Sequence, residues 1–225
     1  MSSKITLHQW EISPFCRKVA RMLEFKGLDY EVVNYNGLRA ILAQRLSPVG
    51  KLPVIDVDGQ RIQDSTRIAR YLDEQHPQPP LYPADAQQRA QAELWEDYAD
   101  ELLYWYEVYL RVNDPQALDQ AVALSMQGRP AVERLPVKLS LRTMLRISLS
   151  GQGLGRMARP DVEAEFLRQL DRIETLLPAS GWLVGDAKTI ADIAVGSQLL
   201  EVVRTSPMRS EIQRRPRLWA WLQNI

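Results

Sequence analysis

Residues 13–16, Ser-Pro-Phe-Cys, combine residue types and a spacing that suit sulfur chemistry at the start of a helix. An apolar, strand-like run at 5–10 precedes them, and a helix-like run at 14–26 follows. The start of a helix presents unpaired backbone N–H groups and the positive end of the helix dipole, so it favours an anion such as a thiolate. The spacing is that of a redox Cys-x-x-Cys site in which Ser13 replaces the first cysteine. We therefore expect Ser13 to stabilise a thiolate that another molecule supplies, while a plain helix-capping role stays open.

Cys16 offers a second chemistry in the same segment. A cysteine one turn inside a helix is more often a small buried hydrophobe than a nucleophile, so we expect Cys16 to be buried. An exposed Cys16 would instead suit thiol exchange. It is the only cysteine, which excludes an intramolecular disulfide and a cysteine-based metal site. Because His8 and His76 are the only histidines, we predict no metal site and a structural role for both.

Pro53 marks a second candidate site, because it opens a strand-like run within the sequence Gly-Lys-Leu-Pro-Val. A proline at the first position of a strand can follow a cis peptide bond, which turns the preceding backbone outward. The N–H and C=O groups of Leu52 could then pair with an extended peptide ligand. Leu52 is thus a candidate backbone contact, and Pro53 has a structural role.

Asp64 and Ser65 place a carboxylate and a hydroxyl at the start of another predicted helix. The helix terminus and the Ser65 hydroxyl suit a ligand carboxylate, while the Asp64 side chain suits an ammonium group. Together they predict recognition of a free amino acid head group. A pair that only caps the helix is the alternative.

The elements that must position these residues alternate between strands and helices up to residue 76. Short apolar or β-branched runs and helical spacing predict them as follows: strands at 5–10, 29–34, 54–57 and 61–63, and helices at 14–26, 39–46 and 66–75. Asp58-Gly59 is a strong two-residue hairpin signal, and Ser65 would cap the last helix. The resulting order at 1–76, βαβαββα, combines a crossover unit with a terminal hairpin.

A proline-rich linker at 77–83 follows, because four prolines between 76 and 83 exclude a helix there. The remainder, 84–225, is predicted to be all-helical, with helical periodicity at 84–111, 162–177, 190–203 and 216–222. A less regular insertion lies at 128–160, and its arginines most simply form a solvated face: Arg142, Arg146, Arg156 and Arg159. The predicted fold class is therefore α+β, with two unlike domains.

The bulk composition narrows the function classes. With 225 residues and 45% hydrophobic residues, the chain can bury a real core. No apolar stretch approaches the roughly 20 residues of a membrane helix, and the N-terminus lacks the pattern of a secretion signal. Lysines plus arginines equal the acids at 28 each, which gives no sign of nucleic acid binding. We expect a cytoplasmic protein without membrane or nucleic acid partners.

Four features in sequence order resemble cytosolic glutathione S-transferases of the serine type. These are the runs S-P-F-C-R-K-V at 13–19, G-K-L-P-V at 50–54 and D-S-T-R-I-A-R-Y-L at 64–72, and then the proline-rich linker before an all-α remainder. The resemblance covers essentially the whole chain and implies a thioredoxin-like domain followed by a helical bundle. The T-I-A-D-I-A run is similar to the family's buried capping motif, in which Thr189 and Asp192 would cap a helix start.

The resemblance also implies the site. Glutathione would lie extended on the first domain, with its cysteine paired to the Leu52 backbone and its thiolate accepting a hydrogen bond from Ser13. The two ends of the tripeptide would be held separately, the γ-glutamyl end by Asp64 and Ser65 and the glycyl carboxylate by Lys51 and Arg39. The activated thiolate would attack a small hydrophobic electrophile in a pocket lined by residues of the long helical run: Tyr98, Tyr104, Trp105 and Tyr109. The family also implies a homodimer.

Two other functions remain open. A glutathione-dependent thiol transferase or reductase would use Cys16 as its nucleophile. A non-catalytic binding protein would keep the fold without turnover, because fold does not fix function. In addition, many relatives carry glutamate where this chain has Asp64, and the shorter acid could change how the ammonium group is held.

Overall fold

The first part of the chain folds in the predicted βαβαββα order, in a computed structural model that describes residues 4–225. Its elements are β1 (Ile5–Gln9), α1 (Pro14–Phe25), β2 (Tyr30–Asn34), η1 (Gly37–Arg45), β3 (Val54–Val57), β4 (Gln60–Gln63) and α2 (Ser65–Gln75). The helix predicted at 39–46 is the 3-10 helix η1. The α+β fold class is confirmed.

The four strands form one mixed sheet in the order β2-β1-β3-β4. β1 runs parallel to β2 and antiparallel to β3, where His8 lies opposite Val54. β3 in turn pairs with β4, where Val54 lies opposite Gln63. The chain therefore leaves β1 and β4, and enters β3, at the same edge of the sheet. That edge carries the turns that precede α1, β3 and α2.

Beyond the linker, the described residues form helices. They are α3 (Ala86–Tyr98), η2 (Ala99–Leu103), α4 (Tyr104–Asn113), α5 (Pro115–Ser125), η3 (Ala131–Glu133), α6 (Arg134–Gln152), η4 (Leu154–Arg156), α7 (Arg159–Leu176), α8 (Ile190–Thr205), α9 (Arg209–Gln213) and α10 (Pro216–Leu222). The run predicted at 84–111 is continuous, but η2 is a π-helical turn between α3 and α4. Such a turn shifts the residues after it around the helix axis, so α3 and α4 present their side chains in different directions.

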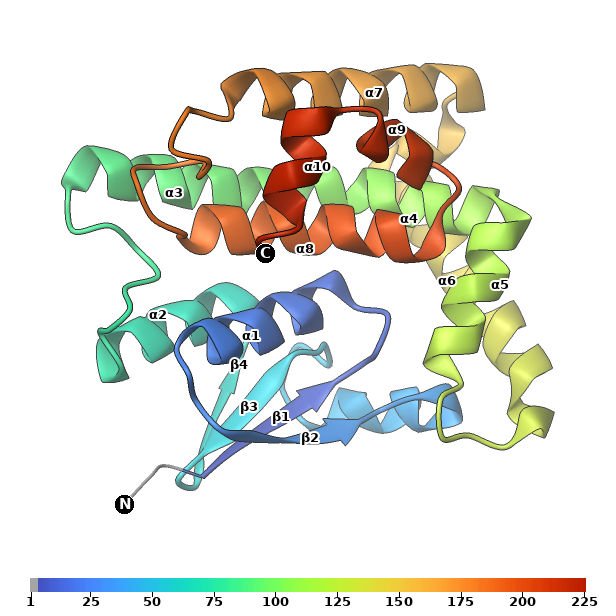
Figure 1. Ribbon diagram of the computed structural model, residues 1–225. Helices are drawn as coiled ribbons and strands as arrows, with labels where there is room; N and C mark the ends of the chain where they lie inside the picture. Colours follow the sequence, from blue (N-terminus) through green and yellow to red (C-terminus); the bar gives the residue numbers. More distant parts are fainter. Residues whose placement is uncertain (1–3) are drawn as a thin grey trace.

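Figure 1 shows α1 and α2 lying directly above one face of the sheet. Above them lie α3, α4 and α8, and α7 lies outermost. α8 is buried along almost its whole length and packs against both α1 and α3. It is therefore one of the elements that join the two units. Within residues 4–225, no helix has the length and apolar character needed to cross a membrane.

The insertion at 128–160 is more regular than predicted, and that prediction was wrong. It contains the long helix α6, which packs against α4 and α5. Its buried residues recur at every fourth position: Val137, Leu141, Leu145 and Leu149. Leu135 lies before them, Leu139 and Ile147 lie between them, and all three are exposed, so they obscured this spacing in the sequence.

Lys26, directly after α1, fixes the linker to the first unit. Its ammonium group donates hydrogen bonds to the Asp73 carboxylate at 3.0 Å and to the carbonyl oxygens of His76 at 2.6 Å and Pro79 at 2.8 Å. Asp73 also accepts the backbone N–H of Leu81 at 2.6 Å. The point at which the chain crosses to the helical unit is thus held in place.

Candidate functional site

The candidate residues of the first unit meet at one edge of the sheet. Ser13 follows the end of β1, Leu52 precedes the start of β3, and Asp64 follows the end of β4. Since β1 and β4 both run antiparallel to β3, these three turns lie side by side. The strand register thereby brings together residues that are far apart in the sequence.

Ser13 is the N-cap residue of α1. Its backbone is extended (φ −87°), and Pro14 occupies the first position of the helix. The Ser13 Oγ accepts the backbone N–H of Cys16 at 3.3 Å, and the Ser13 N–H donates to the carbonyl oxygen of Trp10 at 3.0 Å. The cap uses an acceptor position of the hydroxyl, so the hydroxyl can still donate its hydrogen to a ligand. Capping and thiolate stabilisation are therefore compatible roles.

Cys16 is fully buried, as predicted. Burial raises the pKa of its thiol to about 11, although the backbone N–H of Trp10, which donates to the sulfur at 3.4 Å, opposes the rise. A thiol with such a pKa is protonated near neutral pH, whereas the nucleophile in thiol exchange is the thiolate. Cys16 is thus placed as a core residue. In the described part of the chain, no three His, Cys, Asp or Glu side chains are grouped to hold a metal ion.

The segment before β3 contains the cis peptide bond that a proline at the start of a strand allows. This bond joins Leu52 and Pro53. Pro53 is buried, Leu52 is half-buried and Lys51 is exposed. The backbone of Leu52 therefore lies at the sheet edge, near the end of β1 that leads to Ser13.

The start of α2 differs from the prediction. The N-cap is Asp64 and not Ser65, because the Asp64 Oδ1 accepts the backbone N–H groups of Thr66 and Arg67, both at 3.1 Å. Ser65 is the first residue of the helix and is only 5% exposed. Asp64 has a positive φ of 76°, and its side chain is exposed at the sheet edge. One carboxylate oxygen serves the helix, and the other can face a ligand.

A buried charged cluster lies behind Asp64, and sequence reasoning missed it. The ammonium group of Lys18, on α1, lies 2.7 Å from the Glu96 carboxylate and 2.6 Å from the Asp100 carboxylate. Thr66 of α2 donates its hydroxyl to Glu96 at 2.9 Å. Burial raises the pKa of Asp100 to about 6; Lys18 opposes this, and Glu96 and Asp64 add to it. The one sign of this cluster in the sequence was a lysine, Lys18, on the apolar face of α1.

Arg39 lies in η1, beyond the end of β2. It is exposed, and its guanidinium carbon lies 5.9 Å from the centre of the Tyr35 ring. The backbone N–H of Leu38 donates to Glu133 at 2.9 Å, and Glu133 is also paired with Arg129. The start of the segment that carries Arg39 is thus held by the helical unit.

Two of the four predicted pocket aromatics lie near the Ser13 end of α1. The Tyr104 ring packs against Phe15, with 4.9 Å between ring centres, and Trp105 lies 5.1 Å from Tyr104. Phe15 is two residues after Ser13 and was not identified from the sequence. These three rings form an aromatic surface at the N-terminal end of α1.

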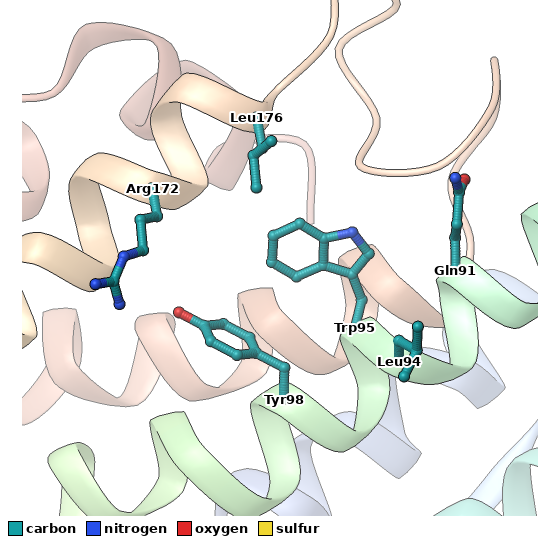
Figure 2. Close-up of a pocket in the computed structure, with 6 residues that line it drawn as sticks. All are labelled: Gln91, Leu94, Trp95, Tyr98, Arg172 and Leu176. Atoms are coloured by element: carbon teal, nitrogen blue, oxygen red, sulfur yellow. The ribbon is translucent and has the colours of Figure 1, made fainter.

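The other two aromatics face away from this surface. Tyr98 donates its hydroxyl to Gln169 of α7 at 2.9 Å, and Tyr109 is 4% exposed near the start of α7. Figure 2 shows Trp95 and Tyr98 rising from α3 toward α7. They line a groove of about 310 Å³ together with Gln91, Leu94, Arg172 and Leu176. The expectation that all four aromatics line one pocket is therefore not met, because they lie on different sides of the α3–η2–α4 helix.

Two family models match the chain. The model described as glutathione S-transferase, N-terminal domain, matches residues 7–80, and the model described as glutathione S-transferase, C-terminal domain, matches residues 155–224. The chain is 28% identical over 223 residues to the isoprene-epoxide–glutathione S-transferase of Rhodococcus sp., a match that covers 96% of this chain and 92% of that protein.

Solved structures show the same architecture. A glutathione S-transferase from Methylobacterium radiotolerans, in complex with glutathione sulfonate, matches with a TM-score of 0.63 and 25% identity, covering 98% of this chain and 89% of that chain. The beta-etherase LigF from Sphingobium sp. shares the fold, with a TM-score of 0.69 at 21% identity and coverage of 100% and 94%.

Proposed function

Because the chain belongs to the glutathione S-transferase family, we propose that it transfers the sulfur of glutathione to a small hydrophobic electrophile. The observation that carries this proposal is the meeting of Ser13, Leu52 and Asp64 at one edge of the sheet. A hydroxyl donor, an open stretch of backbone and a carboxylate at a helix start are the groups that suit a γ-glutamyl tripeptide with a central thiol.

In the proposed complex, glutathione lies along this edge. Its cysteine pairs with the Leu52 backbone, and its γ-glutamyl group lies at the start of α2, on Asp64 and Ser65. The helix N-terminus suits the ligand carboxylate, and the free oxygen of Asp64 suits the ammonium group. At the other end, Lys51 and Arg39 are the cations for the glycyl carboxylate; both are exposed at this side of the unit.

Ser13 acts as a hydrogen-bond donor and not as a base. A free thiol has a pKa of about 8.5, so the site must favour the thiolate to be active near neutral pH. The Ser13 hydroxyl and the N-terminus of α1 both stabilise a negative sulfur. The thiolate then attacks the electrophile. The thiol proton passes to solvent, a new S–C bond forms, and the displaced group, or the oxygen of an opened epoxide ring, keeps the electron pair of the broken bond.

The electrophile binds against the aromatic surface of Phe15, Tyr104 and Trp105. This surface begins at Phe15, two residues after Ser13, and joins the first unit to the helical unit. Flat or unsaturated apolar molecules suit such rings. The name of the Rhodococcus relative adds epoxides to the electrophiles worth testing. A homodimer and a cytoplasmic location remain expectations from the family.

The two alternative functions are less well supported. Burial and a raised pKa disfavour Cys16 as the nucleophile of a thiol transferase or reductase. A non-catalytic binding protein is less well supported because the relatives are named as transferases.

Retention on immobilised glutathione and conjugation of glutathione to a chloronitroarene or an epoxide test the proposal. We expect Ser13→Ala to lower kcat/KM by about tenfold or more, because a hydrogen bond to a charged group contributes about 1.5–3 kcal/mol. Cys16→Ala is the matched control, one helical turn away, and should stay active. Loss in Cys16→Ala alone would favour the reductase. A wild type that is neither retained nor active would contradict the proposal.

A further inference from the structure

Two arginines of the helical unit bind the two carbonyl groups directly before Ser13. Arg111, on α4, donates from Nη2 to the carbonyl oxygen of Ile12 at 2.9 Å. Arg204, on α8, donates from Nη2 to the carbonyl oxygen of Glu11 at 2.7 Å and from Nη1 to the Glu11 carboxylate at 2.9 Å. The turn between β1 and α1 is therefore held from the opposite domain.

Buried acids fix these arginines. Arg111 is paired with Glu107, one turn earlier on α4, and lies 3.6 Å from Glu201 of α8. Glu201 also pairs with Arg204 at 3.1 Å. Arg111, Glu107 and Glu201 are each at most 3% exposed. Burying so many charges is weak evidence for a stabilising role, because their desolvation offsets most of the attraction. A role in fixing geometry explains the cluster better.

The contacts fix the peptide group that leads into Ser13. On one side of this peptide, the Ile12 carbonyl oxygen accepts from Arg111. On the other side, the Ser13 N–H donates to the Trp10 carbonyl oxygen at 3.0 Å. The position of the Ser13 hydroxyl relative to the sheet edge thus depends on a side chain of the helical unit. A misplacement of about 1 Å in a reacting geometry can lower a rate about 100-fold.

We propose that Arg111, anchored by Glu107, is a positioning residue that holds the Ser13 hydroxyl at hydrogen-bond distance from the thiol of bound glutathione. This inference rests on the proposed function. Arg111 touches neither glutathione nor the electrophile, since it acts through the Ile12 carbonyl group. Arg204 supports the same turn through Glu11.

Glu107 and Arg111 form a buried ion pair, so a change in one residue affects the other. Burial raises the pKa of Glu107 to about 7, and the charge of Arg111 opposes that rise. Removing the arginine therefore leaves a carboxyl group that can take up a proton instead of remaining a bare buried charge. For this reason Arg111→Met is a usable variant, and Arg111→Lys keeps the charge but replaces the planar guanidinium group with a compact ammonium group.

The test measures kcat, the KM for glutathione, and the pKa of the bound thiol from its thiolate absorbance. We expect Arg111→Met to lower kcat about tenfold and to raise the bound thiol pKa by about one unit, with the KM for glutathione changed less than about threefold. Arg111→Lys should recover part of the loss. The matched control is Arg21→Met, which removes another interdomain arginine: Arg21 binds Ser197 of α8 at 3.3 Å.

Equal kcat and equal thiol pKa in Arg111→Met and Arg21→Met would overturn the inference while leaving the proposed function intact. If Arg111→Met does not fold, the double variant Glu107→Gln/Arg111→Met, which removes one charge of each sign, should show the same rise in the thiol pKa. An unchanged thiol pKa in the folded double variant would overturn the inference as well. A wild type without transferase activity would overturn the inference and the proposed function together.

Discussion

Ser13 and Cys16 are one helical turn apart, yet their surroundings differ completely. Ser13 precedes the helix, so its side chain lies at the open end of α1. Cys16 is on the helix face that also buries Val19, Ala20 and Leu23 in the core. A polar group at the helix mouth can meet a ligand, whereas a thiol on the core face is desolvated and stays protonated. The residue that would carry chemistry is therefore the serine.

Asp64→Asn tests the proposed contact with the ammonium group. Asparagine tolerates a positive φ and can still cap α2, but it lacks the charge, so we expect the KM for glutathione to rise about tenfold while the melting temperature changes little. The matched control is Asp58→Asn, another exposed aspartate with a positive φ, in the β3–β4 turn. The same KM in both variants would exclude Asp64 from the ammonium site.

At the scale of elements, the sequence predicted local structure best where one or two residues determine the backbone conformation. The turn at Asp58 and Gly59 has φ values of 49° and 86°, both positive, as a two-residue hairpin requires. The helix at Pro216–Leu222 has the predicted bounds. By contrast, α6 was missed because exposed leucines interrupt its buried spacing, and the start of α2 was misplaced because both Asp64 and Ser65 can cap.

The capping box of α8 leads to a stability prediction. The buried Asp192 carboxylate accepts the backbone N–H groups of Leu183 at 2.8 Å and Thr189 at 2.9 Å, and the indole N–H of Trp221 at 3.0 Å. Asp192→Ala leaves these donors unpaired, so we expect it to lower the free energy of unfolding by about 3 kcal/mol. Urea unfolding measures this. The control, Asp85→Ala, removes the exposed cap of α3 and should lower the free energy of unfolding by only about 1 kcal/mol. Similar losses of stability in the two variants would contradict the prediction.

At the scale of the whole molecule, charged contacts between the units concentrate at the first helix and the turn before it. Lys18 binds Glu96 and Asp100, and Arg111 binds the Ile12 carbonyl group. These contacts place the helical unit directly behind the start of α1 and the start of α2. The candidate site is therefore a property of both units, although the residues proposed to bind glutathione all come from the first.

Asp100 makes the stability of the folded protein depend on pH. Burial raises its pKa from 3.8 to about 6, so between these values the folded state binds more protons than the unfolded state. The contribution of Asp100 to stability therefore falls as pH rises through this window. Asp100→Asn removes the titration, and its stability relative to the wild type should increase by about 2 kcal/mol from about pH 4 to about pH 6. Urea unfolding at several pH values measures this. The exposed Asp97→Asn is the control; a parallel change there would exclude the explanation.

The sequence by itself determined the order of elements up to α2, the helix start at Ser13, the hairpin and the linker, because each depends on residues that are neighbours in the chain. It also carried the family's motifs at the sheet edge. Only the tertiary structure decided which side chains meet across the units. Lys18 and Asp100 are 82 positions apart, and Ile12 and Arg111 are 99 positions apart. Periodicity shows which face of a helix is buried, but not which element that face contacts. In addition, the π-helical turn at η2 rotates the aromatic residues away from the positions that regular helical spacing predicts. Hence Tyr104 lies beside Phe15, while Tyr98 faces α7.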